Sequence, residues 1–220
     1  MIAVVATVIT ASPAVPSSPL APASSAVSSS SSSSAFDPTL LRNGDLIFQT
    51  SRSGQSKAIQ LATRSPWSHC GIIYVTGGDY YVYEASTQVK LSPLKRFIKK
   101  GDGRKFEVKR LKAADSLLTP ENQRKLKAEG KRFDGKPYDS FFGWGDDRIY
   151  CSELIYKMYR NALGIEIGAT RKLRDFDLNP PAVAAKLRER YGDSVPLKEV
   201  VIAPSDMYLD SDLVTVYSNF

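Results

Sequence analysis

The stretch HCGIIYVTGGDYYVYEA, residues 69–85, contains two runs rich in β-branched and aromatic residues, joined by Gly77-Gly78. Glycine adopts the positive φ angles that a two-residue hairpin turn requires, and the flanking residues favour strands. The stretch therefore predicts a β-hairpin with strands at residues 69–75 and 80–85.

The turn also predicts the register of this hairpin. If Gly77 and Gly78 are the two turn residues, paired positions sum to 155, so His69 faces Ser86 and Glu84 is its diagonal neighbour on the same face. Glu84 is then placed to accept a hydrogen bond from the imidazole and to fix its tautomer. A bulge that shifted the register by one residue would turn Glu84 to the other face. A half-exposed strand histidine and a solvated carboxylate are the alternatives.

Cys70 follows His69 directly, so its side chain points to the opposite face of the strand, together with Ile72 and Tyr74. We therefore predict that Cys70 is a core residue. A disulfide between Cys70 and Cys151 is not expected, because the two side chains should lie on different sides of the strand.

A second informative stretch is CSELIYKMYRNAL, residues 151–163, which is followed by Gly164. Its apolar residues recur at the spacing of an amphipathic helix on the face of Cys151, and glycine is typical just after a helix. The Cys151 thiol then lies in the first turn, where unpaired N–H groups favour the nucleophilic thiolate. A small buried hydrophobe is the alternative. His69 is the only histidine, so any thiol–imidazole pair must use it.

The rest of the body is β-rich at first and then mixed with helices, an order that predicts the α+β class. We expect further strands at residues 46–48, 106–111 and 197–203. Helices are expected at residues 56–62, from Thr119-Pro120 onward, and at residues 181–191.

The first forty residues differ from the body. An apolar run at residues 2–9 and the small residues and prolines after it resemble the middle and end of a secretory signal, although no Lys or Arg precedes the run. We assign residues 1–40 to a signal-like, Ser/Pro/Ala-rich disordered segment and residues 41–220 to one folded domain. Export to the periplasm or the cell exterior is the prediction. A mispredicted start on a cytoplasmic protein is the alternative.

The amino-acid composition excludes several classes of protein. With 42% hydrophobic and 24% charged residues the chain is typical of globular proteins, and two cysteines with one histidine exclude a disulfide scaffold and a zinc finger. The net charge of +7 comes without a nucleic-acid-binding motif, so no nucleic acid is expected, whereas the basic run at residues 124–132 suits an anionic cell-envelope or lipid surface. Neither a metal nor a cofactor is predicted, because the adjacent Asp146 and Asp147 point apart. The oligomeric state is left open.

Several motifs together resemble the YiiX/YebB-like branch of the NlpC/p60-type papain-like cysteine hydrolases. They cover the body and none of the serine-rich segment, and their histidine and glutamate precede the cysteine, in the permuted order of that branch. The resemblance implies an α+β, circularly permuted papain-like fold with an antiparallel sheet packed against helices. The matching segments are GDLIF (44–48), SHCG (68–71), YEA (83–85), GKPYD (135–139), YCSEL (150–154) and FDL (176–178).

The resemblance also implies roles for individual residues. It makes Cys151 the nucleophile, His69 the base and Glu84 the group that orients the imidazole. Tyr138, in a Gly-x-Pro-Tyr segment, becomes a candidate oxyanion donor together with the backbone N–H of Cys151. Tyr150 stands where NlpC enzymes typically have Asp, so the substrate contacts of those enzymes are not transferred.

These roles predict a cysteine hydrolase that cleaves an amide or related acyl bond in a small-molecule, peptide or acylated substrate through an acyl-enzyme. An acyltransferase or thioesterase acting on lipid-like substrates is one alternative, and a binding module without turnover is another. Nearby aromatic residues are expected either to line an apolar pocket or to lie in the core: Trp67, Tyr138, Phe141, Phe142 and Trp144.

Overall fold

The computed structural model describes residues 36–220, so the signal-like segment predicted for residues 1–40 lies outside them except for its last five residues. Six strands form one antiparallel sheet in the order β4-β3-β2-β1-β5-β8, and a short β6-β7 ladder lies apart from it. The strands are β1 (Leu46–Gln49), β2 (His69–Thr76), β3 (Asp79–Ala85), β4 (Val89–Pro93), β5 (Glu107–Leu111), β6 (Arg171–Lys172), β7 (Val200–Val201) and β8 (Leu213–Ser218).

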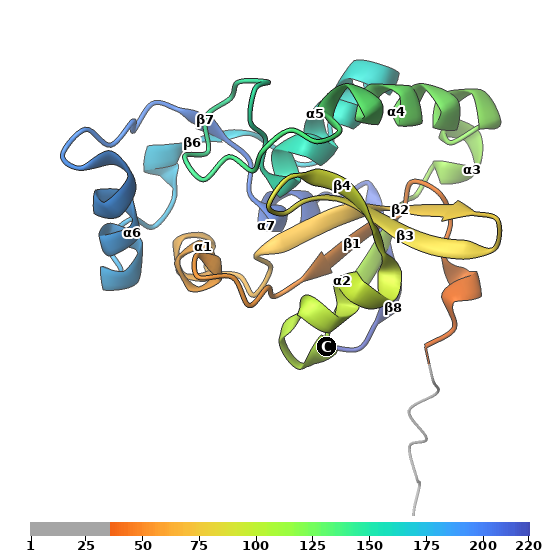
Figure 1. Cartoon of the computed structure of the whole chain (residues 1–220), viewed down its shortest axis with the longest axis horizontal. Helices are drawn as coiled ribbons and strands as arrows, with labels where there is room; N and C mark the ends of the chain where they lie inside the picture. The colour runs from red at the N-terminus through yellow and green to blue at the C-terminus, as the bar shows by residue number, and fades with distance from the viewer. Residues whose placement is uncertain (1–35) are drawn as a thin grey trace, which may run out of the picture. The chain divides into compact units, whose positions relative to one another are not determined.

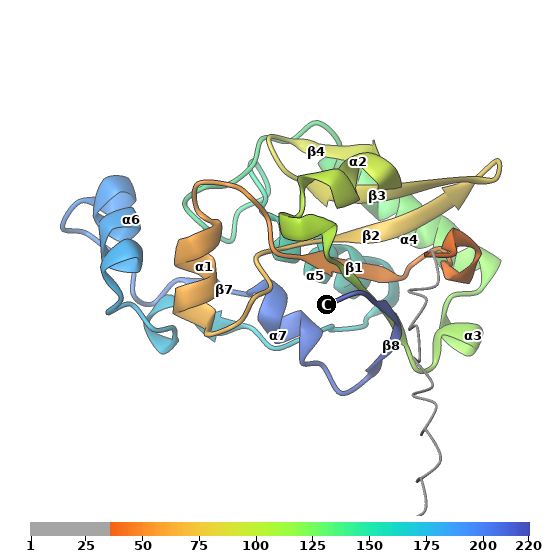
Figure 2. The same ribbon diagram turned by 90° about the horizontal axis from the view of Figure 1, so that it is seen from below.

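Helices cover both faces of the sheet (Figures 1 and 2). The α5 helix packs against β2 and β3 on one face, with α4 beside it, and α2 packs against β3 and β4. The helices are α1 (Ser56–Thr63), α2 (Leu94–Lys100), α3 (Ala114–Leu117), α4 (Pro120–Phe133), α5 (Cys151–Leu163), α6 (Pro181–Tyr191) and α7 (Pro204–Tyr208), with short 3-10 turns η1 (Pro38–Leu40), η2 (Asp102–Arg104) and η3 (Leu173–Asp175). This α+β architecture is the predicted fold class.

The predicted hairpin register is confirmed. Ile72 pairs with Tyr83, so paired positions sum to 155, and the turn residues Gly77 and Gly78 both have positive φ angles. Alternation along the strands therefore puts His69 and Glu84 on one face of the sheet and Cys70 on the other. The face with His69 and Glu84 is the one that α2 covers, since Phe97 of α2 stacks on the His69 ring.

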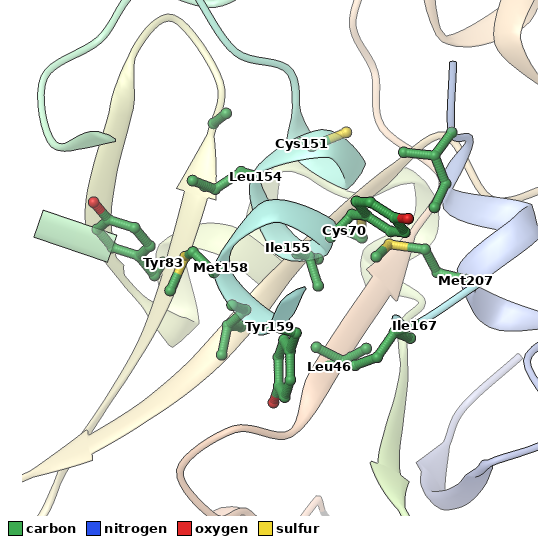
Figure 3. Close-up of a cluster of buried hydrophobic side chains, with 14 of the residues drawn as sticks. Leu46, Cys70, Tyr83, Cys151, Leu154, Ile155, Met158, Tyr159, Ile167 and Met207 are labelled. Atoms are coloured by element: carbon green, nitrogen blue, oxygen red, sulfur yellow. The ribbon is translucent and has the colours of Figure 1, made fainter. Parts of the chain in front are cut away.

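The opposite face carries the main core, where α5 packs on the sheet (Figure 3). Leu154, Ile155, Met158 and Tyr159 are fully buried there. The helix has the predicted bounds, and Gly164 ends it in the left-handed conformation. This packing holds the first residue of the helix, Cys151, at the end of the sheet where β2 begins.

Other predicted elements differ from the structure in extent. The strand expected at residues 197–203 is reduced to β7, because turn hydrogen bonds from the Leu197 and Glu199 N–H groups interrupt the segment. The pattern did not predict β4, α2 or β8. Pro93 joins β4 directly to α2, whose charged sequence shows little apolar periodicity.

The packing of α5 gives a stability prediction. Leu154→Ala should lower the free energy of unfolding by about 2–5 kcal/mol. The core loses apolar contacts, and it closes only partly around the cavity that the truncated side chain leaves. Leu209→Ala is the matched control: Leu209 is 76% exposed, and its truncation should change stability by less than about 0.5 kcal/mol. Urea denaturation followed by circular dichroism measures both. Equal losses in the two variants would contradict the packing described.

Candidate active site

The three residues predicted to form the catalytic centre come from three elements. His69 is the first residue of β2, Glu84 lies near the end of β3, and Cys151 opens α5. Cys151 is only 2% exposed, and Figure 3 shows it at the N-terminal end of its helix, beyond Leu154. The fold thus brings a thiol, an imidazole and a carboxylate to one end of the hairpin.

His69 and Glu84 form a buried ion pair. The imidazole Nε2 lies 2.6 Å from Glu84 Oε2, while the second carboxylate oxygen accepts hydrogen bonds from Ser92 Oγ at 2.7 Å and Lys100 Nζ at 3.0 Å. Burial by itself raises the pKa of Glu84, but the bond to His69 and the other two donors lower it to about 2. Glu84 is therefore a carboxylate held in place from β2, β4 and α2.

The imidazole of His69 is held in its protonated form. Burial by itself lowers its pKa, but the hydrogen bonds and negative charges of Cys151 and Glu84 outweigh this and raise the pKa to about 9. Since Nε2 faces Glu84, Nδ1 is the ring nitrogen left for the thiol. His69 thus lies between an acceptor that orients it and the sulfur that it stabilises.

Cys151 has the properties of an activated thiol. A hydrogen bond from the Cys70 thiol lowers its pKa most; burial opposes this, but the hydrogen bond and charge of His69 and the Cys70 backbone N–H lower it further. The result is a pKa well below that of an ordinary cysteine. A thiolate at this position is the form that attacks carbonyl groups.

The prediction that Cys70 lies away from Cys151 is wrong. Cys70 is fully buried in the core, as expected, yet it lies close enough to Cys151 for its thiol and its N–H to lower the pKa of that thiol. The reason is that α5 packs on the Cys70 face of β2, so its first residue arrives on that side. His69 still reaches the sulfur because it is the first residue of β2, at the end of the sheet. Both cysteines are free thiols.

Tyr138 lies beside the thiol in the segment between α4 and α5. Its hydroxyl oxygen accepts a hydrogen bond from Gln55 Nε2 at 2.7 Å, and Gln55 Oε1 accepts one from Arg190 at 2.6 Å. Burial and the negative charge at Cys151 raise the pKa of Tyr138 well above its ordinary value. Because its oxygen accepts from Gln55, the neutral hydroxyl keeps its own proton to donate.

Sequence reasoning missed Gln55 and Arg190. They flank or lie within predicted helices, and no local motif distinguishes them, since Arg190 is 135 residues from Gln55 in the chain. Only the tertiary fold, which places α1 beside α6, brings them to Tyr138.

Lys157 ties the segment that carries Tyr138 to α5. Its Nζ donates to the carbonyls of Trp144 and Gly145 and forms ion pairs with Asp146 and Glu153. Glu153 lies in the first turn of α5, where its carboxylate also accepts a hydrogen bond from the Tyr150 N–H. Burial raises its pKa to about 7. These contacts fix the position of the segment.

Two cavities adjoin at this site. One is apolar and lies between α1 and α6, with Cys151, Tyr138 and Phe142 in its wall. The other is polar and lies over His69 and Glu84, again with Tyr138 in its wall. The other three aromatic candidates pack elsewhere: Trp67 on Phe48 and Tyr208, Trp144 on Tyr156, and Phe141 on Tyr191.

Within residues 36–220, no group of three or more His, Cys, Asp or Glu side chains is arranged to hold a metal ion. The one histidine uses Nε2 for Glu84 and has the thiol as its second partner. In the same part of the chain, no helix is long and apolar enough to cross a membrane.

The α+β fold, an antiparallel sheet packed against helices, is that of the permuted papain-like proteins. The chain belongs to the permuted papain-like amidase family YaeF/YiiX, C92, whose family model matches residues 40–217. It is 48% identical over 175 residues to the protein YiiX of Escherichia coli (strain K12), a match that covers 80% of this chain and 85% of the relative. A crystal structure described as that of the metalloprotein YiiX from Escherichia coli O157:H7 superposes with a TM-score of 0.78 and 47% identity, over 81% of this chain and 98% of that one.

The ionisation of Cys151 gives a prediction about thiol reactivity. At neutral pH, iodoacetamide should alkylate Cys151 faster than an ordinary cysteine, because its thiolate is already formed. In the His69→Ala variant the pH at which alkylation begins should move up toward the ordinary thiol pKa of about 8.5. Rates measured from pH 4 to 10, with peptide mapping to separate Cys70 from Cys151, provide the test. Fast labelling of Cys70, or a wild-type Cys151 that titrates like an ordinary cysteine, would show that Cys151 is a plain buried residue. An unchanged profile without His69 would show that the imidazole does not stabilise the thiolate.

Proposed function

We propose that the protein is a cysteine hydrolase that cleaves an amide or related acyl bond through an acyl-enzyme intermediate. The observation that carries this proposal is the thiol of Cys151 beside a protonated His69 that Glu84 holds in place. A binding module would not need a thiol with a strongly lowered pKa. Membership of a family described as amidase enzymes supports the same reaction class.

The side chains suggest the following sequence of steps. The Cys151 thiolate attacks the substrate carbonyl carbon, and the Tyr138 hydroxyl and the Cys151 backbone N–H donate hydrogen bonds to the oxyanion. His69 then gives its proton to the leaving group, which departs from the acyl-enzyme. Next, His69 removes a proton from water, and the hydroxide attacks the acyl carbon and frees the thiolate. Glu84 keeps the imidazole oriented throughout.

This mechanism assigns no step to a metal. The related protein from Escherichia coli O157:H7 is described as a metalloprotein. In this chain the donors near the thiol do not fit a metal centre, since the histidine is engaged by Glu84 on one side and by Cys151 on the other.

A second candidate function is acyl transfer or thioester cleavage on a lipid-like substrate. The apolar cavity beside Cys151 favours it, because Ile59, Leu187 and Ile202 there suit an alkyl chain. In acyl transfer an amine or alcohol would replace water in the second step. In thioester cleavage a thiol would be the leaving group of the first step, and water would still attack in the second. Export remains a prediction from the sequence. Contact with an anionic cell-envelope or lipid surface is likewise a prediction, and the exposed basic side chains of α4 support it.

Labelling with an acyl-directed electrophile tests the proposed function. The wild-type protein should form one covalent adduct, mapped to Cys151, and Cys151→Ser should keep its fold but lose both adduct and turnover, since a serine hydroxyl is far harder to ionise. Cys70→Ser is the matched control. It should retain most activity, because a serine hydroxyl can still donate to the Cys151 sulfur as the Cys70 thiol does. It should lose some stability, because it places a hydroxyl in the core. An adduct on Cys70, or turnover that survives in Cys151→Ser, would contradict the assignment.

A further inference from the structure

The proposed nucleophile and the proposed acid face cavities of opposite character. Cys151 lies in the wall of the apolar cavity between α1 and α6. Figures 1 and 2 both show these two helices side by side. His69 lies in the wall of the polar cavity, which we call the polar groove. Tyr138, Gln55 and Arg190 line both cavities, so the two meet at the proposed oxyanion site.

The polar groove is strongly cationic. Six basic side chains line it, whereas Glu84 is the one carboxylate among its lining residues in the described part of the chain. Glu84 is already paired with His69 and Lys100. Arg52 pairs with Asp102 and Lys186 with Glu189, both outside the groove lining. Lys90, Lys99 and Arg190 form no salt bridge within residues 36–220, so they are the cations of the groove that are left uncompensated. The six are Arg52, Lys90, Lys99, Lys100, Lys186 and Arg190.

The groove also contains buried polar atoms that lack a partner among residues 36–220. Both polar atoms of the Gln49 side chain and the hydroxyl of Ser86 are in this state. Gln49 pairs with His69 across β1 and β2 and is fully buried on the same face of the sheet. Buried polar groups in folded proteins are almost always hydrogen-bonded, so these atoms are suited to a bound polar ligand.

Arg190 is the cation best placed to bind an anion. Its guanidinium donates to Gln55 and lies 5.0 Å over the Phe142 ring, which fixes its position. No carboxylate in the described part of the chain forms a salt bridge with it, so its other N–H groups remain available. A guanidinium with free donors binds carboxylate or phosphate in a bidentate manner. Through Gln55, Arg190 is also linked to Tyr138.

We propose that the two cavities separate the two halves of the substrate, and that the leaving group carries an anion, a carboxylate or a phosphate, bound by Arg190 and Lys99 in the polar groove. This inference rests on the proposed function. The acid that protonates the leaving group must face it, and His69 faces the groove. The acyl half bonded to Cys151 then occupies the apolar cavity.

The proposed reaction consists of two half-reactions. The Cys151 sulfur forms a bond to the acyl carbon, and the carbon–nitrogen bond of the amide breaks. The nitrogen takes the proton of His69 and leaves as an amine that carries the anion. Water later hydrolyses the thioester and releases the apolar acid.

Binding to the otherwise intact Cys151→Ala protein tests the anion subsite without turnover. Calorimetry would compare N-octanoylglycine with N-octanoylglycinamide, and the phosphate ester of N-octanoylethanolamine with N-octanoylethanolamine itself. We expect at least one anionic compound to bind tenfold or more tightly than its uncharged analogue, and the pair with the larger difference identifies the anion.

Substitutions then assign the anion to its residues. Arg190→Gln should reduce this difference at least fivefold, and Lys99→Gln, an exposed position where folding is not at risk, should reduce it less. Arg188→Gln is the matched control, because Arg188 lies exposed on the same helix outside the groove. Equal affinities for charged and uncharged compounds, or a difference that survives both Arg190→Gln and Lys99→Gln, would overturn the proposal.

Acylation of wild-type Cys151 by the uncharged S-phenyl thiooctanoate, followed by mass spectrometry, separates this inference from the proposed function. Acylation without any preference for the anionic compounds would overturn the inference about the leaving group, while the proposed hydrolase function would stand. A preference for anions without acylation would overturn the proposed function, and with it the assignment of the anion to a leaving group.

Discussion

The buried contact between His69 and Glu84 is the interaction on which the rest of the site depends. Glu84 is fully buried, so its charge must be compensated locally, and β2, β4 and α2 each supply one donor: His69, Ser92 and Lys100. Removal of one partner from a buried pair typically costs about 3–5 kcal/mol, because the other charge is left uncompensated. The hairpin register, the short β4 strand and the α2 helix are thus coupled to the orientation of one imidazole.

The pH range of this contact follows from the two pKa values. The pKa of His69 rises from 6.5 to about 9 on folding, so its stabilisation is complete below 6.5 and is lost as the pH rises through about 9. The pKa of Glu84 falls from 4.5 to about 2, so its stabilisation is complete above 4.5 and is lost as the pH falls toward 2. Near neutral pH the imidazolium is therefore available both to stabilise the Cys151 thiolate and to protonate a leaving group.

Local patterns in the sequence predicted the parts of the site that local structure determines. The Gly77-Gly78 turn determined the register that puts Glu84 beside His69, and the apolar spacing of α5 put Cys151 in its first turn. Contacts between distant segments had no such signal. The sequence pattern did not reveal which face of β2 receives α5, so the contact of Cys70 with Cys151 was predicted wrongly. The Tyr138–Gln55–Arg190 chain of hydrogen bonds was missed for the same reason.

The measurement that tests this account most directly is the NMR titration of His69, which is the only histidine in the chain. Its ring ¹⁵N shifts report the imidazole alone. The account predicts a protonated ring through neutral pH with a pKa near 9, and a pKa that falls toward the ordinary value of about 6.5 when Glu84→Gln or Cys151→Ala removes a negative partner. A wild-type pKa at or below 6.5, or one that both substitutions leave unchanged, would contradict the thiolate–imidazolium pair at the centre of the proposed mechanism.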